Sequence, residues 1–503
     1  MKTVKSATLD GFEALSVEVE TSFSKALPAF SIVGLGNASI QESKERVKSA
    51  LLFINFKFPP LKITVNLSPS EVYKSGSHFD LPIALSIALQ NENVNFDDFH
   101  IFGELGLDGK LKDSDSIFVI VLSLIKQNKI KKVLVPKESV EKIKNLPNIE
   151  IYAISTLQEA IDLFLQGDFE AAKVAICKEI SEKFVEINGV RYYQNQNFEL
   201  DFGDILGQSF AKRAALIAAA GNHNMIMEGS PGCGKSMIAK RLPFIMPPMS
   251  LDEILEKAKL ESFEGKEPTF EAMRTFRSPH HSSTRASIFG GGTNGAKIGE
   301  IAIGSNGVIF FDELPHFAKN ILEAMREPLE DHKILISRVN SKIEYKTKFL
   351  FICAMNPCPC GNLLSTQKEC RCNELEIKRY KNRLSEPFLD RIDLHIQMND
   401  LSENDKHIVT SNELAEKVLG AFVMQKNRGQ SDFNGKLKDE DIKKFCVLDV
   451  ELEEILQTAA QRFGLTYRGI NKIKKIARTI ADLENTQNIA KSHILEALSY
   501  RKR

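Results

Sequence analysis

The chain has 503 residues, of which 43% are hydrophobic and 26% charged, and its 66 basic residues balance 66 acidic ones. This length predicts two to four domains, and the composition is that of an ordinary globular protein. A formal net charge of zero excludes a protein that coats nucleic acid through bulk positive charge, but it leaves room for local basic patches. No apolar run reaches the ~18 residues that span a bilayer and no signal peptide is evident, so we expect a cytoplasmic protein without membrane partners.

The first part of the chain mixes strand and helix patterns. Within residues 1–170, the apolar alternation at 61–67 and the run at 131–136 predict strands, and 81–90 predicts a helix. Residues 171–200 are polar and rich in charge, which is typical of a linker between domains.

The remaining 300 or so residues carry two further patterns. In residues 201–400, strongly hydrophobic strands alternate with helix-length stretches, which predicts a parallel sheet covered on both faces. Residues 401–503 show helical periodicity only. We therefore predict an α/β protein with an N-terminal domain, a linker, a parallel-sheet core and a C-terminal helical domain.

A phosphate-binding loop is the clearest motif in the core. An apolar strand leads into a loop that is followed by a helix, and the loop has the spacing G-x-x-x-x-G-K-S. The nucleotide-binding residues are predicted to be Gly229, Ser230, Pro231, Gly232, Cys233, Gly234, Lys235 and Ser236. Lys235 would reach the β- and γ-phosphates of ATP, and the Ser236 hydroxyl would ligate Mg²⁺. A chance glycine-rich turn is the alternative, which the strand–loop–helix context disfavours.

Two carboxylates and one amide follow later strands of the same core. Asp312 and Glu313 end a buried strand, and we predict that Asp312 holds Mg²⁺ while Glu313 polarises the attacking water. Either acid alone could instead cap a helix. Asn356 ends the next strand and is predicted to sense the γ-phosphate or position water, although Asn-Pro also closes loops.

Two arginines complete the candidate catalytic set. Arg391 lies just before the helical region, and Arg468 opens one of its helices. An arginine that stabilises the transferred phosphoryl group comes from the same subunit or from a neighbour. Surface arginines are common, so position in the sequence alone does not assign either one a role.

The motifs in this order resemble an AAA+ ATPase, and several are more specific. These are residues 277–283 (RSPHHSS), 290–292 (GGG), 311–315 (FDELP), 356–361 (NPCPCG) and 478–483 (RTIADL). Together they resemble the magnesium-chelatase-like AAA+ ATPases of bacteria, the YifB/ComM competence family. The resemblance covers essentially the whole chain.

The resemblance implies a ring, a homo-hexamer, with ATP bound between subunits. In it, Arg391 would be the finger that enters the neighbouring site, and Arg468 would be the sensor of a helical lid at 401–503. The implied activity is an ATP-dependent DNA motor, a branch-migration helicase that extends heteroduplex when transforming DNA recombines with the chromosome.

A hairpin in the core offers contacts for DNA. Residues 334–340 and 342–350 are predicted to pair, with Arg338, Lys342 and Lys346 near the turn. Basic side chains at a pore could follow phosphates of branched or single-stranded DNA without reading sequence. A solvated surface hairpin is the alternative.

The N-terminal domain, 1–170, resembles the Lon-protease-like α+β domain that this family shares with the recombination protein RadA. The matching stretches are residues 76–82 (GSHFDLP), 103–109 (GELGLDG) and 133–138 (VLVPKE). A peptidase of that kind needs a nucleophilic serine and a lysine. His78 and Phe118 stand at those positions and Ser77 lies one residue away, so we expect a non-proteolytic domain that contacts DNA or other subunits.

Four of the eight cysteines fall within fifteen residues: Cys358, Cys360, Cys370 and Cys372. Four thiolates suit tetrahedral Zn²⁺ in a structural site, but C-x-C spacing is tighter than the usual C-x₂-C. A loop of free thiols is therefore the alternative to a structural zinc site.

Two other functions share the ATPase core. One is a metal-insertion motor like magnesium chelatase, and the other is a protein-remodelling AAA+ ATPase. The N-terminal domain and the Cys-x-Cys loop favour the DNA motor.

Overall fold

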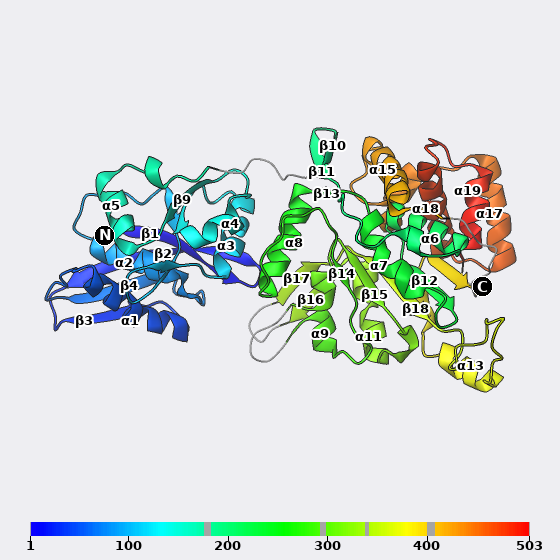
Figure 1. Ribbon diagram of the computed structural model, residues 1–503, viewed down its shortest axis with the longest axis horizontal. Helices are drawn as coiled ribbons and strands as arrows, with labels where there is room; N and C mark the ends of the chain where they lie inside the picture. Colours follow the sequence, from blue (N-terminus) through cyan, green and yellow to red (C-terminus); the bar gives the residue numbers. More distant parts are fainter. Residues whose placement is uncertain (1, 176–182, 292–297, 338–341, 400–407, 502–503) are drawn as a thin grey trace. The chain divides into compact units, whose positions relative to one another are not determined.

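The computed structural model describes residues 2–175, 183–291, 298–337, 342–399 and 408–501. The chain divides into two compact units, one made of Met1–Ser181 with Ala258–Phe270, the other of Glu182–Lys257 with Glu271–Arg503 (Figure 1). The division expected from the sequence follows chain order, whereas the first unit also includes residues 258–270 from the middle of the chain.

The first unit is built on a seven-stranded mixed sheet with the order β3-β4-β2-β1-β5-β8-β9. Its strands are β1 (Thr3–Asp10), β2 (Glu13–Ser24), β3 (Ala29–Val33), β4 (Lys62–Ser68), β5 (Phe99–Ile101), β8 (Lys132–Pro136) and β9 (Glu150–Ile154). Strand β2 runs antiparallel to β1 and β4, while β5, β8 and β9 follow β1 in parallel. The strands predicted at 61–67 and 131–136 are thereby confirmed as β4 and β8.

Helices pack on this sheet where the sequence is apolar. They are α1 (Ala38–Phe53), α2 (Asp80–Ala88), α3 (Ser116–Lys126), α4 (Val140–Ile143) and α5 (Leu157–Gln166). Helix α2 confirms the helix predicted at 81–90 and is buried along most of its length, as is α3. Helix α5 begins where the Thr156 side chain accepts the Glu159 N–H and ends at Gly167, whose φ of 72° suits glycine.

The second unit contains a five-stranded sheet with the order β14-β15-β18-β12-β19. Its strands are β12 (Met225–Gly229), β14 (Phe276–Arg277), β15 (Val308–Phe311), β18 (Leu350–Met355) and β19 (Leu394–Met398). Every pairing in this sheet is parallel, which confirms the predicted parallel sheet. The residues that follow β12, β15 and β18 therefore meet at one edge, the carboxyl edge.

Helices of the second unit surround the sheet and continue to the C-terminus. The longer ones are α6 (Ser209–Gly221), α7 (Lys235–Ile245), α13 (Glu374–Lys381), α15 (Ser411–Asn427), α16 (Asp439–Phe445), α17 (Val450–Phe463), α18 (Tyr467–Leu483) and α19 (Lys491–Ser499). Helix α8 (Leu251–Phe263) begins in this unit, and its residues from 258 onward belong to the first unit. Shorter helices are α9 (Arg285–Phe289), α10 (Glu300–Ile303), α11 (Lys319–Ala324), α12 (Arg326–Glu330) and α14 (Glu386–Leu389). Helices α15 and α18 contact α6, and one continuous hydrophobic core joins the sheet to the C-terminal helices.

Two smaller sheets complete this unit. The hairpin β10 (Phe184–Ile187) and β11 (Val190–Tyr193), within the segment expected to be a linker, joins β13 (Met249–Ser250). A second hairpin pairs β16 (Lys333–Ser337) with β17 (Lys342–Lys346).

The β16–β17 hairpin corrects one expected placement. Lys342 pairs with Ser337 beside the turn, but Lys346 pairs with Lys333 at the base of the hairpin. Lys346 is therefore not near the turn, because in an antiparallel pair each step along one strand moves away from it. Arg338 lies outside the described residues.

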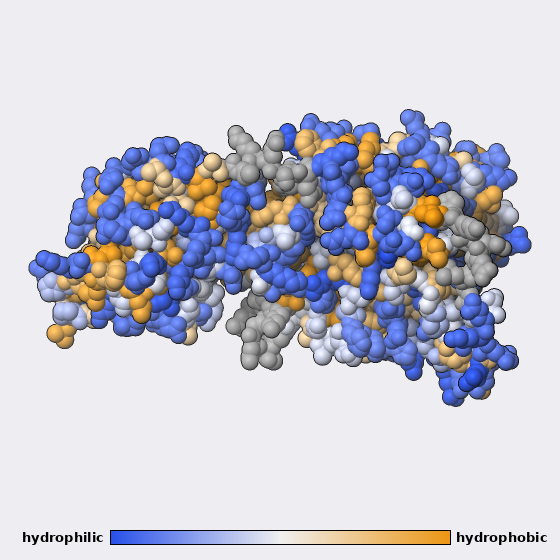
Figure 2. All heavy atoms as spheres, viewed as in Figure 1, coloured by the Kyte–Doolittle hydropathy of each residue, from blue (hydrophilic) through white to orange (hydrophobic). Residues whose placement is uncertain are grey.

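Hydrophilic residues cover most of the face shown in Figure 2, with small apolar patches between them. Among the described residues, no helix combines the length and the apolar character needed to cross a membrane.

Candidate nucleotide-binding site

The phosphate loop connects β12 to α7, as its sequence predicts. Gly232 and Gly234 have φ angles of 84° and 97°, in the left-handed region that favours glycine. Gly229 is required for a different reason, since a Cβ there would lie 2.8 Å from the Met398 carbonyl oxygen on β19. The glycines thus allow a tight loop packed against the neighbouring strand.

The Lys235 ammonium occupies the inside of this loop. It donates to the Gly229 oxygen at 2.6 Å and the Ser230 oxygen at 2.9 Å, and it lies 3.4 Å from Asn356 Oδ1. The Lys235 side chain is buried, and these partners are all neutral oxygens. The buried Ser230 hydroxyl has no hydrogen-bond partner among the described residues. A buried positive charge beside an unpaired hydroxyl fits a bound phosphate.

Ser236 and Asp312 meet as the sequence predicts. The Ser236 hydroxyl donates to Asp312 Oδ2 at 2.9 Å, joining the start of α7 to the end of β15. A hydroxyl and a carboxylate on one side of a phosphate loop are oxygen donors that suit Mg²⁺. These two residues would hold the ion, which would neutralise phosphate charge when bound.

Glu313 has a contact that the sequence did not reveal. Its backbone is left-handed, with φ 50°, and its N–H donates to Asp312 Oδ1 at 2.9 Å. Its carboxylate lies 3.5 Å from His281 Nδ1, so His281 is placed to orient it. His281 follows β14, whose carboxyl end adjoins that of β15. His281 belongs to the RSPHHSS motif, but its contact with Glu313 does not follow from the sequence, because the β14–β15 pairing is not visible in it.

Arg391 and Arg468 lie together, away from the phosphate loop. Both form ion pairs with the Glu330 carboxylate. Arg391 lies at the amino edge of the sheet, where the Asn224 side chain, just before β12, donates to its carbonyl at 2.9 Å. The phosphate loop begins at the other end of β12, about 16 Å away at the usual rise per residue. Neither arginine therefore reaches the phosphate loop of its own chain.

The two arginines perturb their shared carboxylate. Partial burial alone would raise the pKa of Glu330, but the hydrogen bond and charge of Arg391, with the charge of Arg468, lower it below its usual value. Glu330 therefore stays ionised at neutral pH and keeps both pairs.

The four clustered cysteines converge in the loop after β18. Cys358 Sγ lies 3.4 Å from Cys360 Sγ and 3.7 Å from Cys370 Sγ, and all four sulfur atoms lie within 4.8 Å of one another. A tetrahedron with Zn–S bonds of about 2.3 Å has S–S edges of about 3.8 Å. Backbone N–H groups of Asn362 and Arg371 lower the pKa of Cys360 to about 6, whereas burial and hydrogen bonds to the neighbouring sulfur atoms raise the pKa of Cys370 and Cys372. The cluster fits a structural zinc ion.

This cysteine loop packs on the phosphate loop. A Cβ on Gly361, whose φ is 82°, would lie 2.8 Å from the Pro231 ring. Asn356, two residues before Cys358, is also the residue that approaches Lys235. The cysteine cluster therefore supports the position of Asn356 at the nucleotide site.

Comparison with known proteins agrees with this geometry. Residues 201–406 match the family described as magnesium chelatase, subunit ChlI, residues 19–139 match subunit ChlI of Mg-chelatase, and residues 409–501 match its C-terminal part. Competence protein ComM of Haemophilus influenzae is 37% identical over 502 residues, which cover 98% of this chain and 95% of that protein. This chain is a member of the magnesium-chelatase-like ComM/YifB family.

Other ComM/YifB relatives are described as uncharacterized. YifB proteins of Salmonella typhimurium and Escherichia coli are each 34% identical over 501 residues, which cover 98% of this chain and 95% of each relative. The magnesium-chelatase match indicates ATPase activity, with ATP and Mg²⁺ as the ligands of the phosphate loop.

The N-terminal unit of this ComM/YifB protein has a buried histidine where the Lon-like pattern would have a serine. His78 is fully buried, with Nε2 2.9 Å from the Ala7 oxygen and Nδ1 3.0 Å from Ser116 Oγ. Phe118, at the lysine position, is also buried. The Ser77 hydroxyl donates to the Glu104 carboxylate. The hydroxyl nearest the serine position is thus paired with an acid instead of a lysine.

His78 is expected to make the first unit sensitive to acid. Burial lowers the pKa of His78 to about 4, partly offset by the Ala7 carbonyl. Between pH 6.5 and 4 the unfolded chain binds a proton that the folded chain does not, so the free energy of unfolding falls as pH falls, by about 3 kcal/mol. Urea unfolding of the full chain from pH 7 to 4 measures this loss.

Two variants isolate that effect. His78→Phe should reduce the pH dependence of the unfolding free energy by the contribution of one histidine, whatever it does to stability at pH 7, whereas His280→Gln at an exposed position should not. Some dependence should remain in His78→Phe, because burial also lowers the pKa of His100 in the same unit to about 4. An unchanged slope in His78→Phe would show that the loss arises elsewhere.

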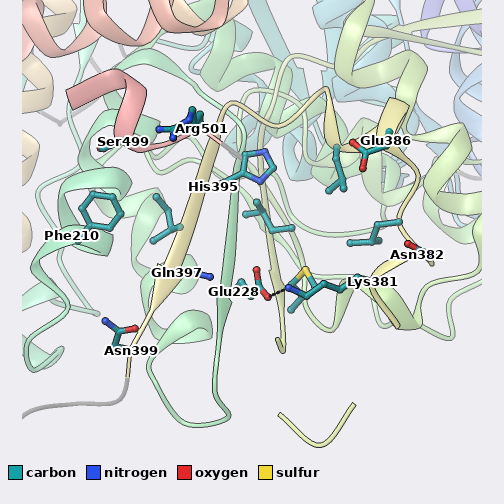
Figure 3. A pocket seen from close by; sticks show the side chains of 15 residues that line it. Phe210, Glu228, Lys381, Asn382, Glu386, His395, Gln397, Asn399, Ser499 and Arg501 are labelled. Atoms are coloured by element: carbon teal, nitrogen blue, oxygen red, sulfur yellow. Dashed lines mark ion pairs between the residues drawn. The ribbon is translucent and has the colours of Figure 1, made fainter. Parts of the chain in front are cut away.

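A separate cavity of 580 Å³ lies beside β12 and β19 (Figure 3). Its lining includes the ion pair between Lys381 Nζ and Glu228 Oε1 at 2.8 Å, with Phe210 and Arg501 farther along. None of the described residues 229–236 lines it. It is therefore distinct from the phosphate pocket.

Proposed function

We propose that this protein is an ATP-driven, ring-forming DNA motor, a branch-migration helicase that extends heteroduplex during recombination in natural transformation. Lys235, Ser236, Asp312, Glu313 and Asn356 support ATP hydrolysis, since they meet at one edge of the sheet. In this proposal Lys235 binds the phosphates, Glu313 orients the attacking water and Asn356 positions the γ-phosphate.

The proposed ring is supported by the separation of Arg391 and Arg468 from the phosphate loop of the same chain. Arg391 and Arg468 lie at the amino edge of the sheet, whereas Lys235 lies at the carboxyl edge. Arginines are needed to stabilise charge on the transferred phosphoryl group. A ring, which we take to be a homo-hexamer, brings the amino edge of one subunit to the nucleotide of the next. Arg391 then acts as the finger, and Arg468, expected to be a lid sensor, joins it from the same side.

Two features support DNA as the substrate. The Haemophilus influenzae relative that is similar over nearly the whole chain is named a competence protein. The β16–β17 hairpin follows the helix that carries Glu330, and it places Lys342 beside its turn. In this proposal Lys342 and Arg338 contact phosphates of the DNA backbone, and such contacts do not depend on the base sequence.

The proposal assigns a role to each region. Residues 201–400 form the AAA+ core and 401–503 the helical lid, while 171–200 connect them to the N-terminal domain at 1–170. That domain is Lon-protease-like and non-proteolytic, and it serves as a platform for DNA or other subunits. We propose that the protein acts in the cytoplasm.

Zinc in the cysteine cluster is part of the proposal and is directly testable. Purified protein should carry close to one zinc per chain, and the pair Cys370→Ser and Cys372→Ser should remove it, since two thiolates do not close a tetrahedral site. Cys446→Ala, at a buried cysteine outside the cluster, should keep the metal. Elemental analysis after metal-free purification decides, and less than about 0.2 zinc per chain in the unaltered protein would contradict the site.

A metal-insertion motor is the second candidate, favoured by the match of three segments to magnesium chelatase. The deciding experiment measures ATP hydrolysis with a four-way DNA junction, linear duplex, unfolded polypeptide or a porphyrin with Mg²⁺. The four-way junction should stimulate ATP hydrolysis most, and branch migration should convert it into separate duplexes without cutting a strand. Lys235→Ala is the inactive control. Stimulation by polypeptide or porphyrin alone would overturn the DNA motor.

Within that experiment, the hairpin register predicts a graded effect. Lys342→Glu should weaken junction binding and reduce stimulation several-fold, because it reverses a charge beside the turn. Lys346→Glu, the same charge change at the base, should have a smaller effect. Equal effects of the two variants would exclude the turn as the DNA contact.

A further inference from the structure

One carboxylate, on Glu330, pairs with both arginines of the proposed finger set. Arg391 Nη2 pairs with Glu330 Oε2, and Arg468 Nη2 pairs with Glu330 Oε1. The two arginines come from distant parts of the chain, one before β19 and one at the start of α18. Glu330 therefore holds together two groups that no local sequence relation joins.

Arg391 is largely occupied in this arrangement. Its Nη1 donates to the Pro387 oxygen at 2.5 Å, and its side chain is only 12% exposed. Its Nε is buried and has no hydrogen-bond partner among the described residues. To reach a phosphate on another subunit, the guanidinium must exchange at least its Glu330 contact.

The surroundings are suited to that exchange. A cavity of 770 Å³ is lined by Glu330 and both arginines, together with Lys436, Lys472 and other residues of both charges. A phosphate pairs with the same N–H groups of arginine as a carboxylate does, and it carries more charge. Glu330 thus occupies the place on the arginines that a phosphate would take.

Glu330 is also next to the proposed DNA hairpin. It is the last residue of α12, and β16 begins three residues later at Lys333. Between them, the His332 oxygen accepts the Thr347 N–H at 2.8 Å and closes the base of the hairpin. If DNA binding displaces the hairpin, the displacement therefore reaches Glu330 through only two intervening residues.

We propose that Glu330 is a positioning residue for the arginine finger: it holds Arg391 and Arg468 in the absence of DNA and releases them to the nucleotide phosphates of the neighbouring subunit when the hairpin binds DNA. This inference rests on the ring and on the DNA motor proposed above. It adds a residue that limits hydrolysis until DNA is present.

Glu330→Gln in the full chain tests the role, because it removes the charge but keeps the shape. Without DNA, kcat for ATP hydrolysis should rise about three- to tenfold, the effect of losing partly exposed ion pairs that compete with phosphate. The KM for ATP should stay within about twofold, since Lys235 and Ser236 are untouched. The DNA-stimulated maximum should not change, so the fold stimulation by DNA should shrink.

Glu327→Gln is the matched control, one turn earlier on the exposed side of α12, and should behave as the unaltered protein. A lower or unchanged kcat in Glu330→Gln would overturn the inference. So would a rise that persists when Arg391→Ala is added, because the effect would then not act through the finger. If Arg391→Ala alone leaves hydrolysis intact, the proposed ring site itself fails, which separates the two failures.

Discussion

Glu313→Gln is expected to slow ATP hydrolysis by about 100-fold or more while ATP still binds. Glu313 follows β15 at the edge where Lys235 and Ser236 lie, but its side-chain contact within the described part of the chain is with His281 and not with the phosphate loop. Glutamine keeps the shape of the side chain and its reach to His281, but it cannot take a proton from water. The loss should therefore appear in kcat, whereas the dissociation constant of ATP should stay within a few-fold.

The measurement is steady-state hydrolysis together with equilibrium binding of ATP to the same preparation. Glu440→Gln, an exposed acid in the first turn of α16, is the matched control and should retain full activity. Hydrolysis by Glu313→Gln within about tenfold of the unaltered protein would show that another group positions the water.

Arg391→Ala is expected to lower kcat by about 1,000-fold, the usual scale for an arginine finger. Because Arg391 and Lys235 lie at opposite edges of one sheet, each site needs Lys235 from one subunit and Arg391 from the next. Mixing Arg391→Ala with Lys235→Ala, each inactive alone, should therefore restore hydrolysis. In a random equal mixture about one interface in four has both groups, so about a quarter of full activity is expected.

The mixing experiment has its own control. Arg379 is an exposed arginine on α13. The Arg379→Ala variant should hydrolyse ATP by itself, and mixing it with Lys235→Ala should not raise its activity. A mixture of Arg391→Ala and Lys235→Ala that stays inactive, in rings shown to contain both chains, would place the finger and the phosphate loop in the same subunit's site.

In the first unit, the apolar pattern of short segments was enough to predict strands and helices. The runs at 61–67, 81–90 and 131–136 became β4, α2 and β8, because apolar period and turn residues act over a few neighbours. The phosphate loop was equally accessible, since its glycines, Lys235 and Ser236 are consecutive. The pairing of Ser236 with Asp312 followed from the rule that carboxyl ends of parallel strands meet.

Sequence therefore determined the phosphate loop, the parallel sheet and the family, all of which depend on short segments or on their order. Only the tertiary structure decided that Arg391 and Arg468 share Glu330, that His281 contacts Glu313, and that residues 258–270 belong with the first unit. It also moved Lys346 to the base of its hairpin. Those relations join residues far apart in the chain, and packing of the whole fold sets which distant side chains meet, a choice that no local periodicity encodes.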